Sequence, residues 1–266
     1  MKRYDDSSMD RLFAHAWGDS IHFGRFDTGV TEIGQATLGT KRRMARESGL
    51  REGDSVLEVG SGWGATARFL AREIGCHVTA TNYSWRQADT ARTLCADLIA
   101  SGSIRFAMAD FHNLPFQDAY FDVHWSQECL VHATDKARVF AEALRVLKPG
   151  GRIVFSDQTT QPDRLSQADR DRIVARHGST DLWDRADFED GLRQAGFGNV
   201  RSQEWTPHMA RHFTELCRRI DTDRPRLEAE IDPDTLRDNY AMWQWGAELA
   251  ADGRIGWALF IGEKPQ

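Results

Sequence analysis

Cysteine is scarce in this 266-residue chain. The four cysteines are Cys76, Cys95, Cys129 and Cys217. Their spacing matches neither a zinc-binding cluster nor the framework of a disulfide-rich domain. The sequence therefore predicts no metal site, and it favours a reduced, cytoplasmic protein.

Long apolar runs are also missing from the sequence. No stretch approaches the roughly 18 consecutive apolar residues of a transmembrane helix. Residues 1–6 are mostly polar or charged and lack the apolar segment of a signal peptide. We expect a protein that is not exported and has no membrane partner.

The sequence also has no excess of positive charge. Lys and Arg number 34 against 40 Asp and Glu, which gives a formal net charge of −6. No basic run with interleaved aromatic residues is present. This balance argues against nucleic acid as a partner, and nothing in the sequence indicates an oligomeric state.

The residues that are present are typical of a globular protein, with 41% hydrophobic and 28% charged side chains. The length suffices for one large domain, with or without a lid. The nine tryptophans exceed what a core of this size needs. Such an excess can indicate a pocket for a flat or cationic ligand, although packing explains any single tryptophan better.

Strand-like apolar runs alternate with helical patterns between residues 52 and 204. Strands are predicted at residues 56–59, 76–80, 104–108, 121–125, 152–155 and 255–261. Helices are predicted from residue 67, over 87–99 and around 140–147, where Pro149, Gly150 and Gly151 stop the last one. This order predicts an α/β fold with a doubly wound, mostly parallel sheet.

Two regions do not follow this alternation. Residues 1–45 precede the first strand, and residues 207–253 insert helical patterns before the last one. We interpret both as lid segments over a core formed by residues 46–206 and 254–266. The alternative is that these helices only cover the sheet. A lid suits group transfer, because it keeps water away from the activated group.

A glycine-rich turn follows the first predicted strand. Gly60 and Gly62 allow a ligand to approach the backbone closely, and Glu58 stands two positions before the first glycine. A carboxylate there repels a pyrophosphate but suits a sulfonium or ammonium group, which favours S-adenosylmethionine. The same glycines also fit a dinucleotide fingerprint or a ligand-free turn.

The next two strands end in further polar residues. Asn82 stands where an NAD enzyme usually carries an acid, and it can bond to a ribose hydroxyl. After the third strand, Asp110 can accept a bond from an adenine amino group, and Phe111 can pack beside the ring.

The fourth strand ends in the segment Ser126-Gln127-Glu128-Cys129-Leu130-Val131-His132. His132 has an ordinary pKa near neutrality and could accept a proton from the methyl acceptor; alternatively, it bonds locally. Glu128 is the second catalytic candidate, or it pairs with a cationic substrate or with a basic residue of the lid.

Together these segments resemble class I S-adenosylmethionine-dependent methyltransferases, from Val56 to about Phe155. The resemblance implies a seven-stranded Rossmann-like sheet and S-adenosylhomocysteine as product. It places Glu58, Gly60 and Gly62 along the methionine part, Asn82 at the ribose, and Asp110 and Phe111 at the adenine. Gln87 and the Ser126 backbone are further cofactor contacts. Asn82 departs from the family, which more often has an acid there.

A narrower resemblance links the segments 17–24 and 125–132 to sarcosine/dimethylglycine N-methyltransferases. It implies methylation of sarcosine or dimethylglycine toward glycine betaine, with His22 and Gly24 of the entry segment in the cofactor site. Trp17, Trp125 and Tyr240 are candidates for an aromatic wall around the quaternary ammonium product. Arg25 or Arg43 could hold the substrate carboxylate.

Two other functions remain open. A methyltransferase acting on an oxygen or carbon of a larger apolar metabolite would use the tryptophan-rich lid as an apolar pocket. An NAD-binding oxidoreductase, or a catalytically silent binding module, would use the glycine turn alone.

Overall fold

A computed structural model describes residues 7–266; the prediction about residues 1–6 lies outside the described residues. Seven strands form one sheet in the order β3-β2-β1-β4-β5-β7-β6. They are β1 (Ser55–Val59), β2 (His77–Asn82), β3 (Ile104–Met108), β4 (Phe121–Gln127), β5 (Leu147–Thr160), β6 (Gly198–Glu204) and β7 (Ile255–Glu263).

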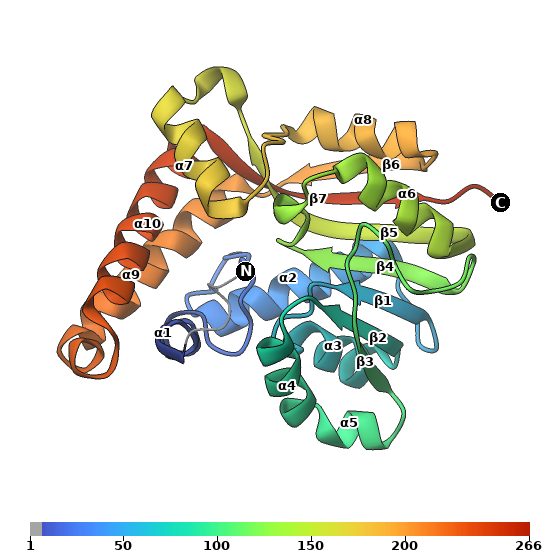
Figure 1. The fold of residues 1–266 in the computed structure, drawn as a ribbon, viewed down its shortest axis with the longest axis horizontal. Coiled ribbons are helices and arrows are strands. Elements are labelled where there is room, and N and C mark those ends of the chain that lie inside the picture. The colour runs from blue at the N-terminus through green and yellow to red at the C-terminus, as the bar shows by residue number, and fades with distance from the viewer. Residues whose placement is uncertain (1–6) are drawn as a thin grey trace.

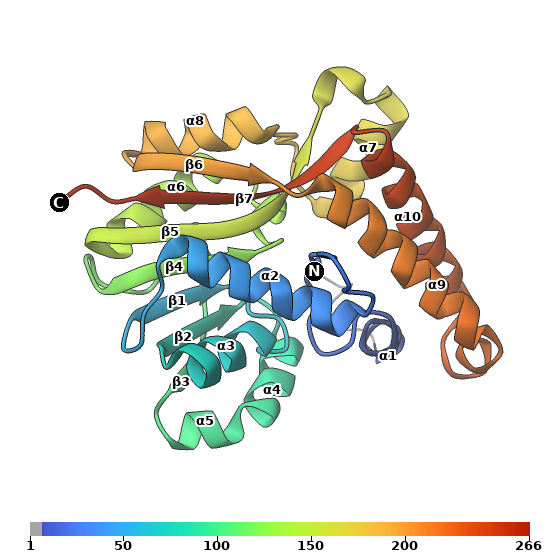
Figure 2. The same ribbon diagram turned by 180° about the vertical axis from the view of Figure 1, so that it is seen from behind.

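Helices cover both faces of this sheet (Figures 1 and 2). In chain order they are α1 (Ser7–Ala16), α2 (Ile33–Ser48), α3 (Ala65–Phe69), α4 (Trp85–Leu94), α5 (Ala96–Ala100), α6 (Lys136–Val146), α7 (Gln167–His177), α8 (Arg185–Ala195), α9 (Thr206–Glu230) and α10 (Pro233–Ala251). Figure 2 shows α2 and α3 in front of the sheet, and Figure 1 shows α6 and α8 in front of the opposite face.

The sheet is mostly parallel, as predicted. β1 pairs in parallel with both β2 and β4, whereas β7 runs antiparallel to β5 and β6. Because the chain passes from β1 to β2 on one side and from β3 back to β4 on the other, the strand order reverses at β1. Doubly wound sheets bind their ligands beside such a point, at the carboxyl ends of the strands.

Some predicted boundaries differ from the observed ones. The helix predicted around 140–147 ends at Val146, and Leu147 already begins β5. Lys148 precedes Pro149, and a residue before proline disfavours the helical conformation. The predicted helix over 87–99 is interrupted at Cys95, whose φ of −112° and ψ of 14° separate α4 from α5.

The N-terminal segment and the insertion both pack against the rest of the chain. One side of α2 is buried, including Ile33, Ala36 and Met44, and the helix packs near β5. The insertion forms the long helical pair α9 and α10, with α1 packed against both (Figure 1). A non-helical residue, Asp223, bends α9 two positions before Pro225.

Across residues 7–266, no helix combines the length and apolar character needed to cross a membrane.

Candidate functional site

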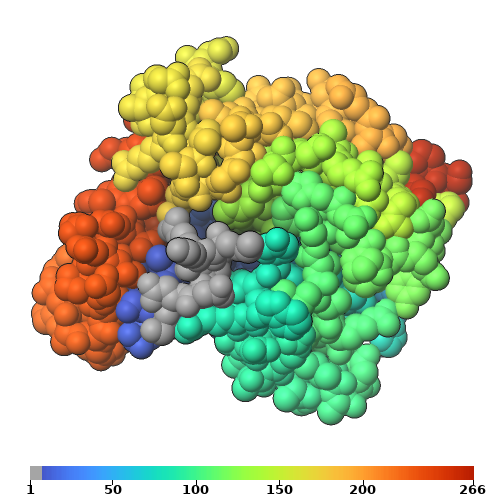
Figure 3. All heavy atoms as spheres, viewed as in Figure 1, coloured from blue at the N-terminus to red at the C-terminus, as the bar shows by residue number. Residues whose placement is uncertain are grey.

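A cavity of about 630 Å³ opens at the carboxyl ends of the strands. On the face shown in Figure 3, the surface is hollowed between the atoms of α7 and those of the segment that follows β4. The cavity is lined by residues 19–22 of the entry segment and by residues 60–63 and Ala65 of the glycine turn. The other lining residues are 81–85, Gln87, 109–112, 127–129, His132, Thr134 and His177.

The glycine turn follows directly from β1. Gly60, Gly62 and Gly64 all have positive φ angles, which side chains disfavour. A Cβ atom on Gly60 would clash with the side chain of Cys129, so this position strongly favours glycine. The close approach of the two loops shapes the floor of the cavity.

Glu58 lies at the end of β1, on the sheet face covered by α2 and α3, because side chains alternate along a strand. It is buried, and one carboxylate oxygen, Oε2, has no hydrogen-bond partner. Burial raises the pKa of the Glu58 carboxyl to about 8, although the charges of Lys41 and Arg68 oppose this shift. One oxygen of this buried carboxyl group therefore has no hydrogen bond within the described chain.

Two further polar groups near the turn lack partners within the described chain. The hydroxyl of Ser61 and the amide nitrogen Nε2 of Gln127 are buried and make no hydrogen bond. The other atom of the Gln127 amide, Oε1, accepts a bond of 2.9 Å from the hydroxyl of Thr66. Both residues line the cavity, so a polar ligand there would satisfy them.

Asn82 organises the loops around the turn. Its Nδ2 donates to the carbonyl of Gly62 at 3.1 Å and to Gln87 at 3.3 Å. Its Oδ1 accepts from the backbone N–H groups of Tyr83 and Ser84. The amide of Asn82, in the predicted ribose position, thus links the glycine turn to the loop between β2 and α4 by hydrogen bonds.

The third loop brings Asp110 and Phe111 to the cavity, as predicted for an adenine site. Asp110 Oδ1 accepts two bonds from His112, from the backbone N–H and from the ring. The Phe111 ring packs 4.7 Å from the ring of His112. These contacts fix the loop, with the side chain of Asp110 still half exposed.

His132 also lines the cavity. It ends a short 3₁₀ turn, Leu130–His132, after β4. Its Nδ1 lies 2.9 Å from the carbonyl oxygen of His177. Because a carbonyl oxygen only accepts, Nδ1 carries the hydrogen and Nε2 is the basic nitrogen of the neutral ring.

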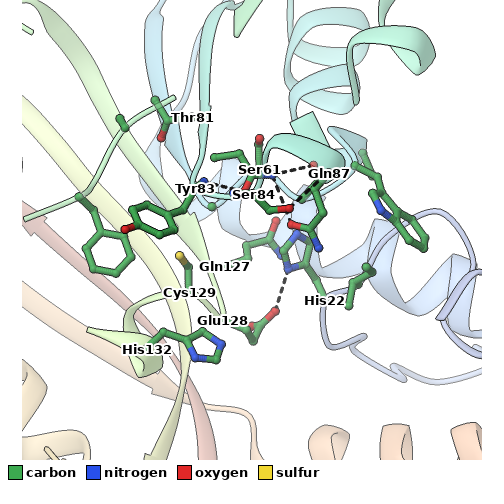
Figure 4. Close-up of a pocket in the computed structure, with 18 of the residues that line it drawn as sticks. His22, Ser61, Thr81, Tyr83, Ser84, Gln87, Gln127, Glu128, Cys129 and His132 are labelled. Carbon is green, nitrogen blue, oxygen red and sulfur yellow. Dashed lines mark hydrogen bonds and ion pairs between the residues drawn. The ribbon is translucent and has the colours of Figure 1, made fainter. Parts of the chain in front are cut away.

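Glu128 joins the entry segment to the sheet. Its carboxylate accepts bonds from the backbone N–H of Phe23, from Ser156 and from Trp257, and it lies 3.2 Å from His22 (Figure 4). Its φ of 44° is unusual for a residue with a side chain. Of the alternatives for Glu128, pairing with a basic residue of the entry segment is the one observed.

The charges around the cavity are mostly negative. Asp19, Asp110 and Glu128 line it, and no lysine or arginine does so among residues 7–266. Glu58 adds a buried carboxyl beneath the glycine turn. Such a site favours a cationic ligand and opposes the diphosphate of a dinucleotide.

Several predicted site residues lie outside the cavity lining. Trp17 packs against Phe23 and His212, and Arg25 stacks on Trp205 while pairing with Asp27. The remaining ones are Glu58, buried at the end of β1; Trp125, buried in the sheet; Tyr240, bonded to Asp221; Arg43, paired with Glu47; Gly24, bonded to His212; and Ser126, buried beside Val59.

Several lining residues were not predicted as site residues from the sequence, among them Ser61, Gln127, Tyr83, Trp85 and His177. Tyr83 and Trp85 come shortly after the predicted ribose residue, Asn82. His177 comes from α7, 45 positions from His132. The position of Tyr83 after a strand could have indicated it, whereas no local signal marks His177.

The comparisons agree with this geometry. A family profile described as a methyltransferase domain matches residues 57–155. The dimethylglycine N-methyltransferase of Parasynechococcus marenigrum is 30% identical over 98% of this chain and 94% of its own. The sarcosine/dimethylglycine N-methyltransferase of Halorhodospira halochloris is 29% identical over the same shares. A solved structure from Galdieria sulphuraria, assigned as a sarcosine dimethylglycine methyltransferase, has a TM-score of 0.88 at 24% identity, covering 98% of this chain and 99% of that chain.

Fold and site together define an enzyme of the methyltransferase class, with a Rossmann-like sheet. The chain belongs to the family of S-adenosylmethionine-dependent methyltransferases that includes the dimethylglycine N-methyltransferases. Its cofactor is S-adenosylmethionine, and the unpartnered polar groups of Glu58, Ser61 and Gln127 fit that ligand. Within the described part of the chain, no cluster of three or more histidine, cysteine or acidic side chains could hold a metal ion.

Proposed function

We propose that this enzyme methylates the nitrogen of a small amino acid, sarcosine or dimethylglycine, toward glycine betaine. The observation that supports it best is the similarity along nearly the whole chain to two N-methyltransferases that act on these compounds. The position of His132 in the cavity lining adds a base for the acceptor nitrogen.

The cofactor end of the site would be formed by the residues around the glycine turn. Glu58 would stabilise a positive charge on the methionine part, and Gln127 would donate a hydrogen bond from Nε2. Asp110 and Phe111 would hold the adenine. His22 would act indirectly, because its contact with Glu128 keeps the entry segment over the site.

At the acceptor end, the chain has to present an unprotonated nitrogen. His132 Nε2 would take the proton of the acceptor amine, and the bond from Nδ1 to the His177 carbonyl would keep the ring in the required tautomer. Bound S-adenosylmethionine supplies a methyl group that is already reactive, so the chain mainly positions the nitrogen and excludes water.

A methyl-transfer screen tests the proposal. Purified enzyme is supplied with methyl-labelled S-adenosylmethionine and with sarcosine, dimethylglycine or apolar acceptors that present a hydroxyl or an aromatic carbon. We expect labelled dimethylglycine or betaine from the two amino acids. Label found only in the apolar acceptors would reject the amine proposal and favour an O- or C-methyltransferase.

A further inference from the structure

Two histidines of α9 accept hydrogen bonds from the entry segment, which continues to Phe26. Nδ1 of His212 accepts from the backbone N–H of Gly24 at 3.0 Å, and Nδ1 of His208 accepts from that of Phe26 at 3.1 Å. A ring nitrogen that accepts a bond from an N–H group carries no hydrogen itself. Both rings are therefore neutral, and each has its one hydrogen on Nε2.

The spacing of these two rings matches the repeat of the segment that they bind. His208 and His212 are four positions apart on α9, which separates them by about 6 Å along the helix axis. In an extended chain, every second N–H group points to the same side, and the repeat is about 6.6 Å. The helix therefore presents two acceptors in the register that a neighbouring strand would offer.

The residue between the two bonded positions faces the other way. The N–H of Arg25 donates to the hydroxyl of Thr40 and to the carbonyl of Ala36, both on α2. A Cβ atom on Gly24 would collide with Ala36, so the backbone runs directly against that helix. The segment is thus held between α2 on one side and α9 on the other.

His212 lies in apolar surroundings. The ring is fully buried and packs edge-on against Phe23, with centroids 5.4 Å apart, and against Phe26, at 5.9 Å. Burial lowers the pKa of His212 to about 3, and the charge of Arg219 on the same helix adds to the shift. This ring therefore remains an acceptor at any pH well above that value.

His208 is partly exposed, and its Nε2 lies 3.9 Å from a carboxylate oxygen of Asp27. Burial lowers its pKa below the ordinary 6.5; the charges of Arg25 and Arg211 add to this shift, and that of Asp27 opposes it. A proton on Nδ1 would break the bond from Phe26, because two N–H donors would then face each other. Protonation therefore favours a released segment, and this effect begins as the pH falls below 6.5.

We propose that His208 and His212 position the entry segment over the cofactor cavity, and that S-adenosylmethionine binding depends on both imidazoles accepting these bonds. Residues 19–22 of the segment line the cavity only a few positions before the bonded ones. A displaced segment would leave one wall of the cofactor site open. The inference concerns the cofactor end of the site and holds whichever acceptor the enzyme methylates.

Substitutions at each histidine separate the accepting nitrogen from the bulk of the ring. Asn places an amide oxygen near the position of Nδ1, whereas Leu fills similar space without an acceptor. Full-length variants are titrated with S-adenosylhomocysteine by calorimetry at pH 7. We expect the dissociation constant to rise about 10-fold in His208→Leu and in His212→Leu, because each leaves a backbone N–H unpaired. The two Asn variants should recover most of the affinity.

A pH series tests the requirement for a neutral ring. The wild-type enzyme and His208→Asn are titrated with S-adenosylhomocysteine between pH 7 and pH 5. The affinity of the wild type should fall about threefold or more beyond the fall in His208→Asn, because the Asn side chain takes up no proton. Glu58 titrates in both proteins, so the difference between them isolates His208. His77→Asn, at the exposed amino end of β2, is the matched control and should bind as wild type at each pH.

Circular dichroism of each protein at each pH reports whether it is folded. If a Leu variant fails to fold, the comparison of wild type with His208→Asn still decides. Wild-type affinity in both Leu variants would overturn the inference, as would equal weakening by Asn and Leu. Parallel pH curves for the wild type and His208→Asn would overturn it as well.

Discussion

At the scale of single residues, the polar groups of this site differ in whether the protein itself satisfies all their hydrogen bonds. Glu128 has a bonding partner for each carboxylate oxygen, and Asn82 uses both ends of its amide. Glu58 and Gln127 each keep one buried atom without a partner. Leaving buried polar atoms unpaired costs free energy, so such atoms mark where a ligand bonds.

The role proposed for His132 gives a prediction at this scale. Replacing His132 by Gln keeps a polar side chain but removes the base, and we expect kcat to fall about 100- to 10,000-fold. The affinity for S-adenosylmethionine, measured by calorimetry, should stay within a factor of three. A variant with wild-type kcat over the whole pH range would reduce His132 to a structural residue.

The sequence indicated the cofactor end of the site better than the acceptor end. Glu58 and Asn82 lie at the carboxyl ends of strands, and Gly60 and Asp110 come shortly after strands. Parallel strands bring their carboxyl ends to one edge of a sheet. No comparable rule predicts which residues surround the methyl acceptor. Trp17 and Tyr240 were chosen for their chemistry, and tertiary packing places both away from the cavity.

At the scale of elements, the entry segment is held by side chains from three directions. The N–H of Phe23 donates to Glu128, that of Gly24 to His212 on α9, and that of Arg25 to Thr40 on α2. The segment therefore has a fixed course without regular secondary structure. The insertion helices act on the site through this segment, since none of residues 207–253 lines the cavity.

The glycine turn offers a comparison between two neighbouring positions. Gly60→Ala combines a disfavoured φ with a clash against Cys129, whereas Gly62→Ala meets only the disfavoured φ, because no atom lies within 4 Å of its added Cβ. We expect unfolding free energy to fall by about 2 to 4 kcal/mol for the first and about 1 to 2 kcal/mol for the second. Urea denaturation without ligand measures both.

Equal losses from the two glycine variants would show that the contact between the turn and Cys129 contributes nothing. A loss confined to Gly62→Ala would contradict the geometry described for the floor of the cavity.

Six of the seven strands were located from the sequence, because their apolar runs are buried in the sheet. β6 was not, since most of its side chains are at least partly exposed and the segment lacks an apolar pattern. The two breaks in predicted helices, at Cys95 and at Leu147, depend on local backbone conformation that periodicity alone does not reveal.

At the scale of the whole molecule, the sheet separates two packed layers and brings the site to one edge. The layer with α2 and α3 contains Glu58, and the layer with α6 and α8 supports His132 through Leu130 and Ala133. The cavity at the carboxyl ends of the strands is lined by Asp19, Asp110 and Glu128 and by no lysine or arginine of residues 7–266. This concentration of acids is what distinguishes a site for a cationic donor from a dinucleotide site.

The most direct test concerns the proton on Glu58. Because its pKa is raised to about 8 in the ligand-free protein, the carboxyl is mostly protonated near pH 7. A positively charged ligand favours the ionised form, so binding should expel the proton. Calorimetric titration with S-adenosylmethionine in two buffers of different ionisation enthalpy counts the protons released.

We predict that the wild-type enzyme releases close to one proton per cofactor bound. Glu58→Gln should release none and bind about 100-fold more weakly, because a buried charge contact is lost. Full affinity in Glu58→Gln, or equal proton release in the two proteins, would contradict the account.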